Sequence, residues 1–415
     1  IAIYALGIGV LAKACFNPRY VTQHSTILLM GIWTGIVATA ALATVSGVSV
    51  GSQGLYAFSM REIDNWVMPL ASLALAWGLA QLYSQRTLIA TYAYTLIAFV
   101  AINCILQLIQ LLQGPSGPVR GLLGFFWSGA SSGSPDSRGF TSVGDRVYTS
   151  ERLTGILNQP AEAGALYSLG LVVLVWAYRS NLVSFPRFTV LAPLMVLGGT
   201  LTISKTFVLV GLPIALVMLL MGASLRQGVS ALICTLFTLI VAWLAFVRDE
   251  WSRSEGLLDW LAGMASIGGA SGGRFGVSGG IFDVTIAEVL SRSPLIGYGI
   301  DSHMHTDAEF VRIIASSGLF GLMLLLLLYG VMIHRALGAK CELDRQTWML
   351  GLAVVAITIL AGLGVPMMPA NRVGSLLVVL IGILLFTGQQ RLVQQSRPAL
   401  SRRTTRRVSL AAVTD

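Results

Sequence analysis

The hydrophobic residues of this chain fall in long unbroken runs separated by polar stretches. Segments such as "LVVLVWAY" and "LFGLMLLLLLYGVMI" are apolar throughout, whereas the strands of a membrane barrel alternate apolar and polar residues. Such runs are typical of helices that cross a bilayer. The pattern therefore predicts an all-α polytopic integral membrane protein with about 11–12 transmembrane helices. Eleven spans can be bounded, at residues 1–14, 27–47, 65–83, 87–113, 162–178, 188–201, 206–222, 228–247, 308–333, 347–364 and 373–388.

The composition agrees with a membrane protein. Hydrophobic residues make up 55% of the 415 residues and charged residues only 11%, against about 25% charged in soluble domains. The net charge of +9 is spread over loops and a tail, so it does not indicate a nucleic-acid partner. The four cysteines have neither a metal-ligand spacing nor the pattern of a disulfide framework.

The positions of the cations predict how the spans are oriented. If the basic tail lies in the cytoplasm, alternation places every short loop rich in Lys and Arg on that side, as the positive-inside rule requires. The short loops on the outer side then hold the single cations Arg61, Lys205 and Arg372. Two long segments also fall on the outer side, where long loops are usually functional or disordered.

This topology divides the chain into six parts. They are N-terminal transmembrane helices (1–113), a first long outer loop (114–161), central transmembrane helices (162–247), a large outer loop with the candidate active site (248–307), C-terminal transmembrane helices (308–388) and a basic cytoplasmic tail (389–415).

Arginines in or beside the long loops are the first candidates for chemistry. Arg152 lies just before the fifth span, in "ERLTGILNQPAEAG", and Arg274 lies in the glycine-rich "SGGRFG". A guanidinium offers a fixed fork of donors that suits phosphate oxygens, and glycines allow backbone N–H groups to approach an anion. A structural interpretation is also open, in which Arg152 pairs with Glu151 or Glu162 and Arg274 is solvated.

A second cluster, "HMHTDAEFVRI", opens the ninth span. His305, Asp307 and Glu309 alternate, so they share a face in an extended segment, and a histidine near a carboxylate can act as a general base. The other interpretation is a capping box, in which Thr306 caps the helix and Glu309 closes the box. Arg312, one turn further on, could bond Glu309 or face a polar cavity.

Two further polar features lie near the outer side. Asn103, Gln107 and Gln110 form a stripe on the fourth span, for which hydrogen bonding between helices is the favoured interpretation. Lys205 lies in the tight turn "LTISKTF", where it could snorkel or contact anionic headgroups.

The order of these motifs resembles the O-antigen ligase and O-antigen polymerase (Wzy-like) superfamily. The resemblance covers roughly residues 150–335. It is carried by "RLTGILNQPAEAGAL" (152–166), "LTISKTFVLVG" (201–211), "GGRFGVSGGIFDVTIAEVLSRSPLIGYGID" (272–301) and "HTDAEFVRIIASSGLFG" (305–321). It implies a bacterial inner-membrane glycosyltransferase with the C-terminus in the cytoplasm and the active site facing the periplasm.

The resemblance implies a donor glycan carried on undecaprenyl diphosphate and transferred with inversion, without a metal or other cofactor. The implied diphosphate ligands are Arg152, Arg274, Arg312 and Lys205, and the base comes from His305, Asp307 or Glu309. Ligases usually carry His-Asn where this chain has Asp307 and Ala308, which favours a polymerase that joins lipid-linked repeat units of O-antigen, capsule or exopolysaccharide.

Two other functions stay open. A ligase would move the glycan to lipid A core, and a transporter or flippase would line a path with charges deep in several spans. The expected partners are the lipid-linked donor, the glycan or lipid A-core acceptor, membrane lipids and other polysaccharide-assembly proteins.

Overall fold

The computed structural model describes residues 24–46, 60–113, 122, 152–157, 159–221, 281–300, 308–341, 343–369 and 372–387. Within these residues the chain is helical, without a strand. The helices are α2 (His24–Val45), α3 (Met60–Leu82), α4 (Gln85–Gln113), α7 (Pro160–Arg179), α8 (Phe185–Leu201), α9 (Leu212–Leu220) preceded by the π-helical turn η4 (Phe207–Gly211), α14 (Ile281–Arg292), α15 (Glu309–Gly338) followed by the 3-10 turn η6 (Ala339–Cys341), α16 (Arg345–Gly362) and α17 (Arg372–Thr387).

Nine of the eleven predicted spans coincide with these helices, and the other two, 1–14 and 228–247, lie outside the described residues. Five helices are long and apolar enough to cross a membrane: those at Ile27–Val45, Gln85–Gln113, Pro160–Arg179, Glu309–Gly338 and Arg345–Gly362. Three shorter apolar helices accompany them, at Phe185–Leu201, Phe207–Leu220 and Arg372–Leu385. The described part of the chain is thus a multi-pass membrane protein. The helix α14 was not predicted, because it lies inside the second long loop.

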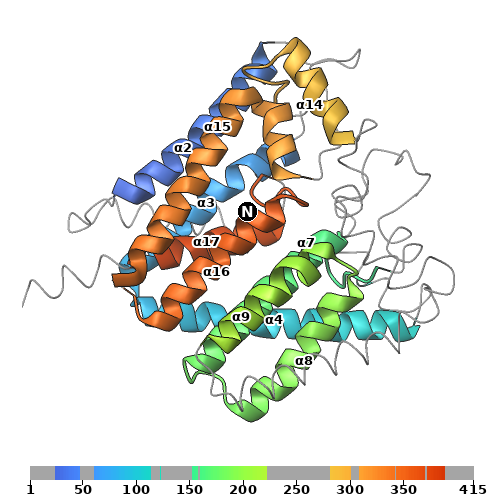
Figure 1. The fold of residues 1–415 in the computed structure, drawn as a ribbon, viewed down its shortest axis with the longest axis vertical. Helices are drawn as coiled ribbons and strands as arrows, with labels where there is room; N and C mark the ends of the chain where they lie inside the picture. The colour runs from blue at the N-terminus through green and yellow to red at the C-terminus, as the bar shows by residue number, and fades with distance from the viewer. Residues whose placement is uncertain are drawn as a thin grey trace, which may run out of the picture.

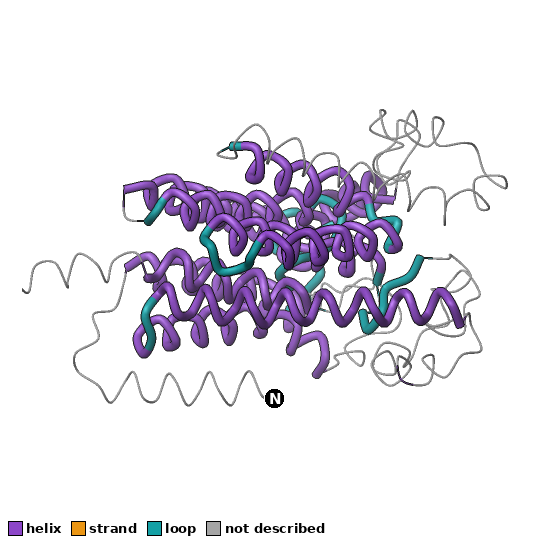
Figure 2. Tube along the Cα trace, turned by 90° about the horizontal axis from the view of Figure 1, so that it is seen from below, coloured by secondary structure: helices purple, strands orange, loops and turns teal. Residues whose placement is uncertain are grey.

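The helices run side by side (Figure 2). One end of the bundle, called here the motif end, gathers residues 152–157, the turn 202–206, the start of α15 and the chain between α16 and α17. At the other end the basic side chains close the helix termini. Arg179 donates to the carbonyl of Met218, and Arg345 donates to that of Met221 at 2.9 Å. Arg179 and Arg345, which the sequence places in two of the short basic loops, thus both bind near the C-terminal end of α9.

Helix α7 lies at the centre of the packing. It contacts α4, α8, α9 and α16, while α15 packs against α2 and α17 against α3. Figure 1 shows α4, α7, α8 and α9 on one side, α2, α3 and α15 on the other, and α16 and α17 between them. Lipid tails are as apolar as leucine, so close packing must hold such helices together. Small residues permit it: a Cβ on Gly164 would overlap the side chain of Ser204, and one on Gly211 that of Ser168.

Helix α15 is broken at Gly318, where φ is 63° and ψ is −160°. The segment 294–300 fills the break. The N–H groups of Tyr298 and Gly299 donate to the carbonyls of Ala315 and Ser316, at 2.7 and 3.0 Å. Beyond the break, the N–H groups of residues 319 and 320 donate to the carbonyls of residues 294 and 295. The segments "PLIGYG" and "GLFG" are therefore two halves of one structure, in which each satisfies backbone groups that the other leaves open.

Candidate functional site

The segment that carries Arg152 is held against α4 by the predicted polar stripe. Asn103 donates to the carbonyl of Thr154 at 3.3 Å and accepts from the N–H of Ile156 at 2.9 Å. One turn later, Gln107 donates to the carbonyl of Leu153 at 2.8 Å. The segment thus runs antiparallel to α4. Gly155 has a φ of 63°, and a Cβ there would collide with the Asn103 amide, so this turn requires a glycine.

The same stripe also joins α4 to α7. The Tyr167 hydroxyl donates to Gln107 Oε1 at 2.6 Å and accepts from Asn103 Nδ2 at 3.1 Å. Hydrogen bonding between helices is therefore confirmed for Asn103 and Gln107. Gln110 is equally buried, but neither of its side-chain polar atoms has a hydrogen-bond partner.

Arg152 closes the C-terminal end of α8. Its Nε donates to the carbonyl of Thr202 at 3.4 Å and its Nη2 to that of Ile203 at 3.0 Å. These carbonyls lie at a helix terminus, where backbone acceptors lack partners within the helix. Glu162, considered above as a partner of Arg152, bonds elsewhere.

The turn that Arg152 holds is the one that carries Lys205. Ile203 adopts a φ of 47°, which turns the chain sharply. Ser204 lies against Gly164 of α7, and Thr206 lies close to Gly364 beyond the end of α16. The structure thus brings together two of the predicted anion ligands, which are remote in the sequence.

Glu309 is the only one of the three candidate bases that lies among the described residues. Its side chain is fully buried, and its Oε2 accepts from the N–H of Met367 at 3.2 Å. The Tyr329 hydroxyl and the N–H of Met368 also interact with this carboxylate, while its Oε1 has no hydrogen-bond partner. A Cβ on Gly362 would lie 3.0 Å from Glu309 Oε2, so this glycine leaves the carboxylate its space.

The capping-box prediction for this helix is wrong. Helix α15 begins at Glu309, with Ala308 at the N-cap and no side-chain bond to the cap. Glu309 instead accepts a hydrogen bond from the chain beyond α16, because that chain offers a backbone donor within the bundle. Arg312 lies one turn further along α15 and is partly exposed.

A second buried glutamate holds the start of α17. Glu162, in the first turn of α7, is 3% exposed and accepts from the N–H of Arg372 at 2.9 Å. It also accepts from the N–H of Val373 and interacts electrostatically with Arg372. The carboxylate thus satisfies backbone donors at a helix N-terminus, where an anion is favoured.

The predicted site residues divide into two groups. Arg152, Lys205, Glu309 and Arg312 lie at the motif end, whereas Arg274, His305 and Asp307 lie outside the described residues, as do His303 and Thr306. Sequence reasoning did not select Glu162, Arg372 or Tyr329. The only signal for Arg372 was its position as a lone cation in a short outer loop.

The break in α15 carries a buried tyrosine. The Tyr298 hydroxyl donates to the carbonyl of Glu288 at 3.0 Å. Burial raises the pKa of this hydroxyl, the Glu288 carboxylate raises it further, and Arg292 opposes the shift.

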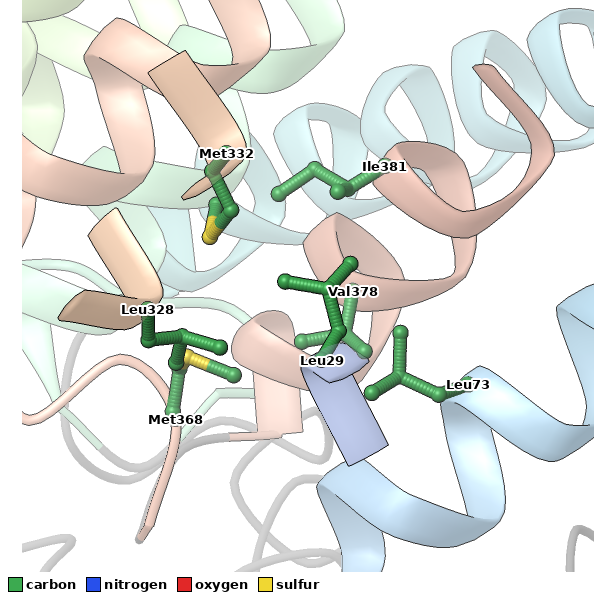
Figure 3. A pocket seen from close by; sticks show the side chains of 7 residues that line it. All are labelled: Leu29, Leu73, Leu328, Met332, Met368, Val378 and Ile381. Atoms are coloured by element: carbon green, nitrogen blue, oxygen red, sulfur yellow. The ribbon is translucent and has the colours of Figure 1, made fainter. Parts of the chain in front are cut away.

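An apolar pocket lies between the helices, away from these polar groups. Figure 3 shows side chains from α2, α3, α15 and α17, together with Met368, around it. Since its lining is apolar throughout, the pocket is not a candidate for chemistry. Its lining residues are Leu29, Leu73, Leu328, Met332, Met368, Val378 and Ile381. Elsewhere in the described ranges, His, Cys, Asp and Glu side chains form no group of three that could hold a metal ion.

Neither a family model nor a curated protein matches this sequence.

Proposed function

We propose that this chain is a membrane glycan polymerase that transfers a polyprenyl-diphosphate-linked oligosaccharide onto another lipid-linked repeat unit. One observation carries the proposal. Arg152 donates to the carbonyls of Thr202 and Ile203, so that its guanidinium and Lys205 share one turn at the motif end. A guanidinium and an ammonium carried by one turn would suit the leaving diphosphate, whose charge they would neutralise without a metal.

The proposed orientation follows from the charge pattern. Arg86, Arg179 and Arg345 lie at the end opposite the motif end, which fits a cytoplasmic face. The motif end would then face the periplasm, with Arg274 and the segment 303–307 supplied by the loops above it.

The proposed reaction is a single displacement. The acceptor hydroxyl oxygen forms a bond to the anomeric carbon as the bond to the diphosphate oxygen breaks, and its electron pair leaves with the diphosphate. The hydroxyl proton passes to His305 or Asp307, and the anomeric configuration inverts. Glu309 is assigned a positioning role, because its carboxylate is buried and already bonded to backbone N–H groups.

A glycan gel tests this function. A strain without the gene is complemented with the wild-type gene or with genes for Arg274→Ala, Arg152→Ala and, as a control, Arg86→Ala at the opposite end. A polymerase predicts acceptor with a single repeat unit and no ladder in the null strain. The ladder should return with wild type and Arg86→Ala but not with the other two variants.

Two other outcomes of the gel select other functions. Long chains that persist on the carrier lipid and never reach lipid A core would assign a ligase. An unchanged ladder in the null strain would overturn both enzymes and favour a transporter.

A further inference from the structure

The chain between α16 and α17 is fastened at two points by buried carboxylates. Glu309, from the first turn of α15, accepts from the N–H groups of Met367 and Met368. Glu162, from the first turn of α7, accepts from those of Arg372 and Val373. Helices α7 and α15 belong to the two sides of the bundle in Figure 1. The backbone at Arg372 is therefore fixed relative to both sides.

The Arg372 side chain is exposed, while the Glu162 carboxylate that interacts with it is buried. This arrangement keeps the guanidinium at the surface of the motif end. Burying a carboxylate is costly unless its hydrogen bonds and charge are compensated. A cation that served only lipid headgroups would need no such anchor, since a long side chain reaches them by itself.

Arg372 lies on the same part of the motif end as Arg152 and Lys205. Glu162, which binds the Arg372 N–H, is two residues before Gly164, and Ser204 packs against Gly164. The residue before Ser204, Ile203, accepts a hydrogen bond from Arg152 through its carbonyl. The N-termini of α7 and α17 meet at this point, and both add positive potential. Three cations are therefore carried by segments that pack near the N-termini of α7 and α17.

We propose that Arg372 is a third cationic ligand of the lipid-diphosphate site of Arg152 and Lys205, and that Glu162 positions it. The proposal rests on the function proposed above. A diphosphate offers more charge and more acceptor oxygens than a monophosphate, so a third cation adds selectivity for it.

Binding of farnesyl diphosphate to the purified full-length chain in detergent micelles tests the assignment without an activity assay. Arg372→Gln should raise the Kd about tenfold or more, the loss expected for one charged hydrogen bond. Arg86→Gln is the matched control, since Arg86 is an exposed cation far from the site. It lies about 25 Å along α4 from Asn103, the residue that binds the segment of Arg152. The control should change the Kd by less than about twofold. Size-exclusion elution and thermal unfolding show whether each variant is folded.

Glu162 is tested by a double-mutant cycle. Glu162→Ala should weaken binding about as much as Arg372→Gln, and the double variant should be no weaker than either single one. Glu162→Gln should recover most of the affinity, because its amide oxygen still accepts from the Arg372 N–H. Additive effects, or no recovery by glutamine in a folded protein, would overturn the positioning role.

The outcomes separate this proposal from the proposed function. If wild type fails to bind farnesyl diphosphate, the diphosphate site itself is wrong. If wild type binds and Arg152→Gln weakens binding but Arg372→Gln does not, only the role of Arg372 is wrong. Farnesyl monophosphate and phosphatidylglycerol serve as comparison ligands. An equal loss for all three would assign Arg372 to general anionic headgroups and overturn the proposal.

Discussion

The carboxylate of Glu309 accepts a hydrogen bond from the N–H of Met367 at 3.2 Å, across the boundary between α15 and the chain that follows α16. The bond joins the first turn of one helix to the connection before another. A residue that the sequence offers as a catalytic base therefore holds backbone through one carboxylate oxygen, while its Oε1 has no hydrogen-bond partner. The same geometry makes the two roles of Glu309 separable by substitution.

We expect Glu309→Gln to retain most of the glycan polymerisation, because the glutamine oxygen still accepts from the N–H of Met367. Glu309→Ala should lose it, since the buried N–H groups of residues 367 and 368 are left without this acceptor. Ladder intensity on the glycan gel, normalised to protein level, is the measurement. Removal of a general base costs about 10²–10⁴-fold in rate. A loss of that size in a folded Glu309→Gln variant would restore Glu309 as the base.

Gly318→Ala should destabilise the protein. Its φ of 63° with ψ of −160° is a conformation nearly restricted to glycine, with a cost of about 1–3 kcal/mol for other residues. A Cβ there would also collide with the backbone of Leu295. The midpoint of thermal unfolding in detergent should fall. Gly330→Ala is the control in the same helix, because nothing lies within 4 Å of a Cβ at that position. Equal midpoints for the two variants would contradict the broken-helix account.

Tyr167→Phe should lower stability by removing one hydroxyl between two buried amides. Gln107 Oε1 loses its donor at 2.6 Å, and Asn103 Nδ2 loses an acceptor at 3.1 Å. Side-chain hydrogen bonds between membrane helices are worth about 0.6 kcal/mol on average, and a buried donor or acceptor left without a partner costs up to about 3 kcal/mol. A loss between these limits is expected in the free energy of unfolding. Tyr178→Phe in the same helix, whose ring stacks on Phe188, should change it little.

Arg152→Lys should fail to replace arginine. The guanidinium reaches the carbonyls of Thr202 and Ile203 with two different nitrogens, and a single ammonium cannot reproduce that fork. We expect a reduced ladder on the gel and a raised Kd for farnesyl diphosphate. Wild-type behaviour of Arg152→Lys in both measurements would mean that only the charge at residue 152 matters.

The helices of the bundle could be predicted from the sequence, because a helix that crosses a bilayer needs a long run of apolar residues and such a run is visible within a single segment. The predicted spans at 87–113 and 162–178 match α4 and α7 closely for this reason. The cations in the short loops predicted the alternation of the spans across the membrane. The hydrogen bonding of the polar stripe was also predictable, since Asn103 and Gln107 share one face of a helix.

Only the tertiary structure decided the partners of the polar groups at the motif end. Arg152 binds the carbonyls at the end of α8, and Glu309 accepts from the chain beyond α16 instead of capping its own helix. The break at Gly318 depends on a segment some twenty residues earlier folding back into it. Such choices depend on which backbone donors and acceptors several helices bring together, and no single segment contains that information. The sequence by itself therefore determined the helices and their order, while packing decided which side chains meet.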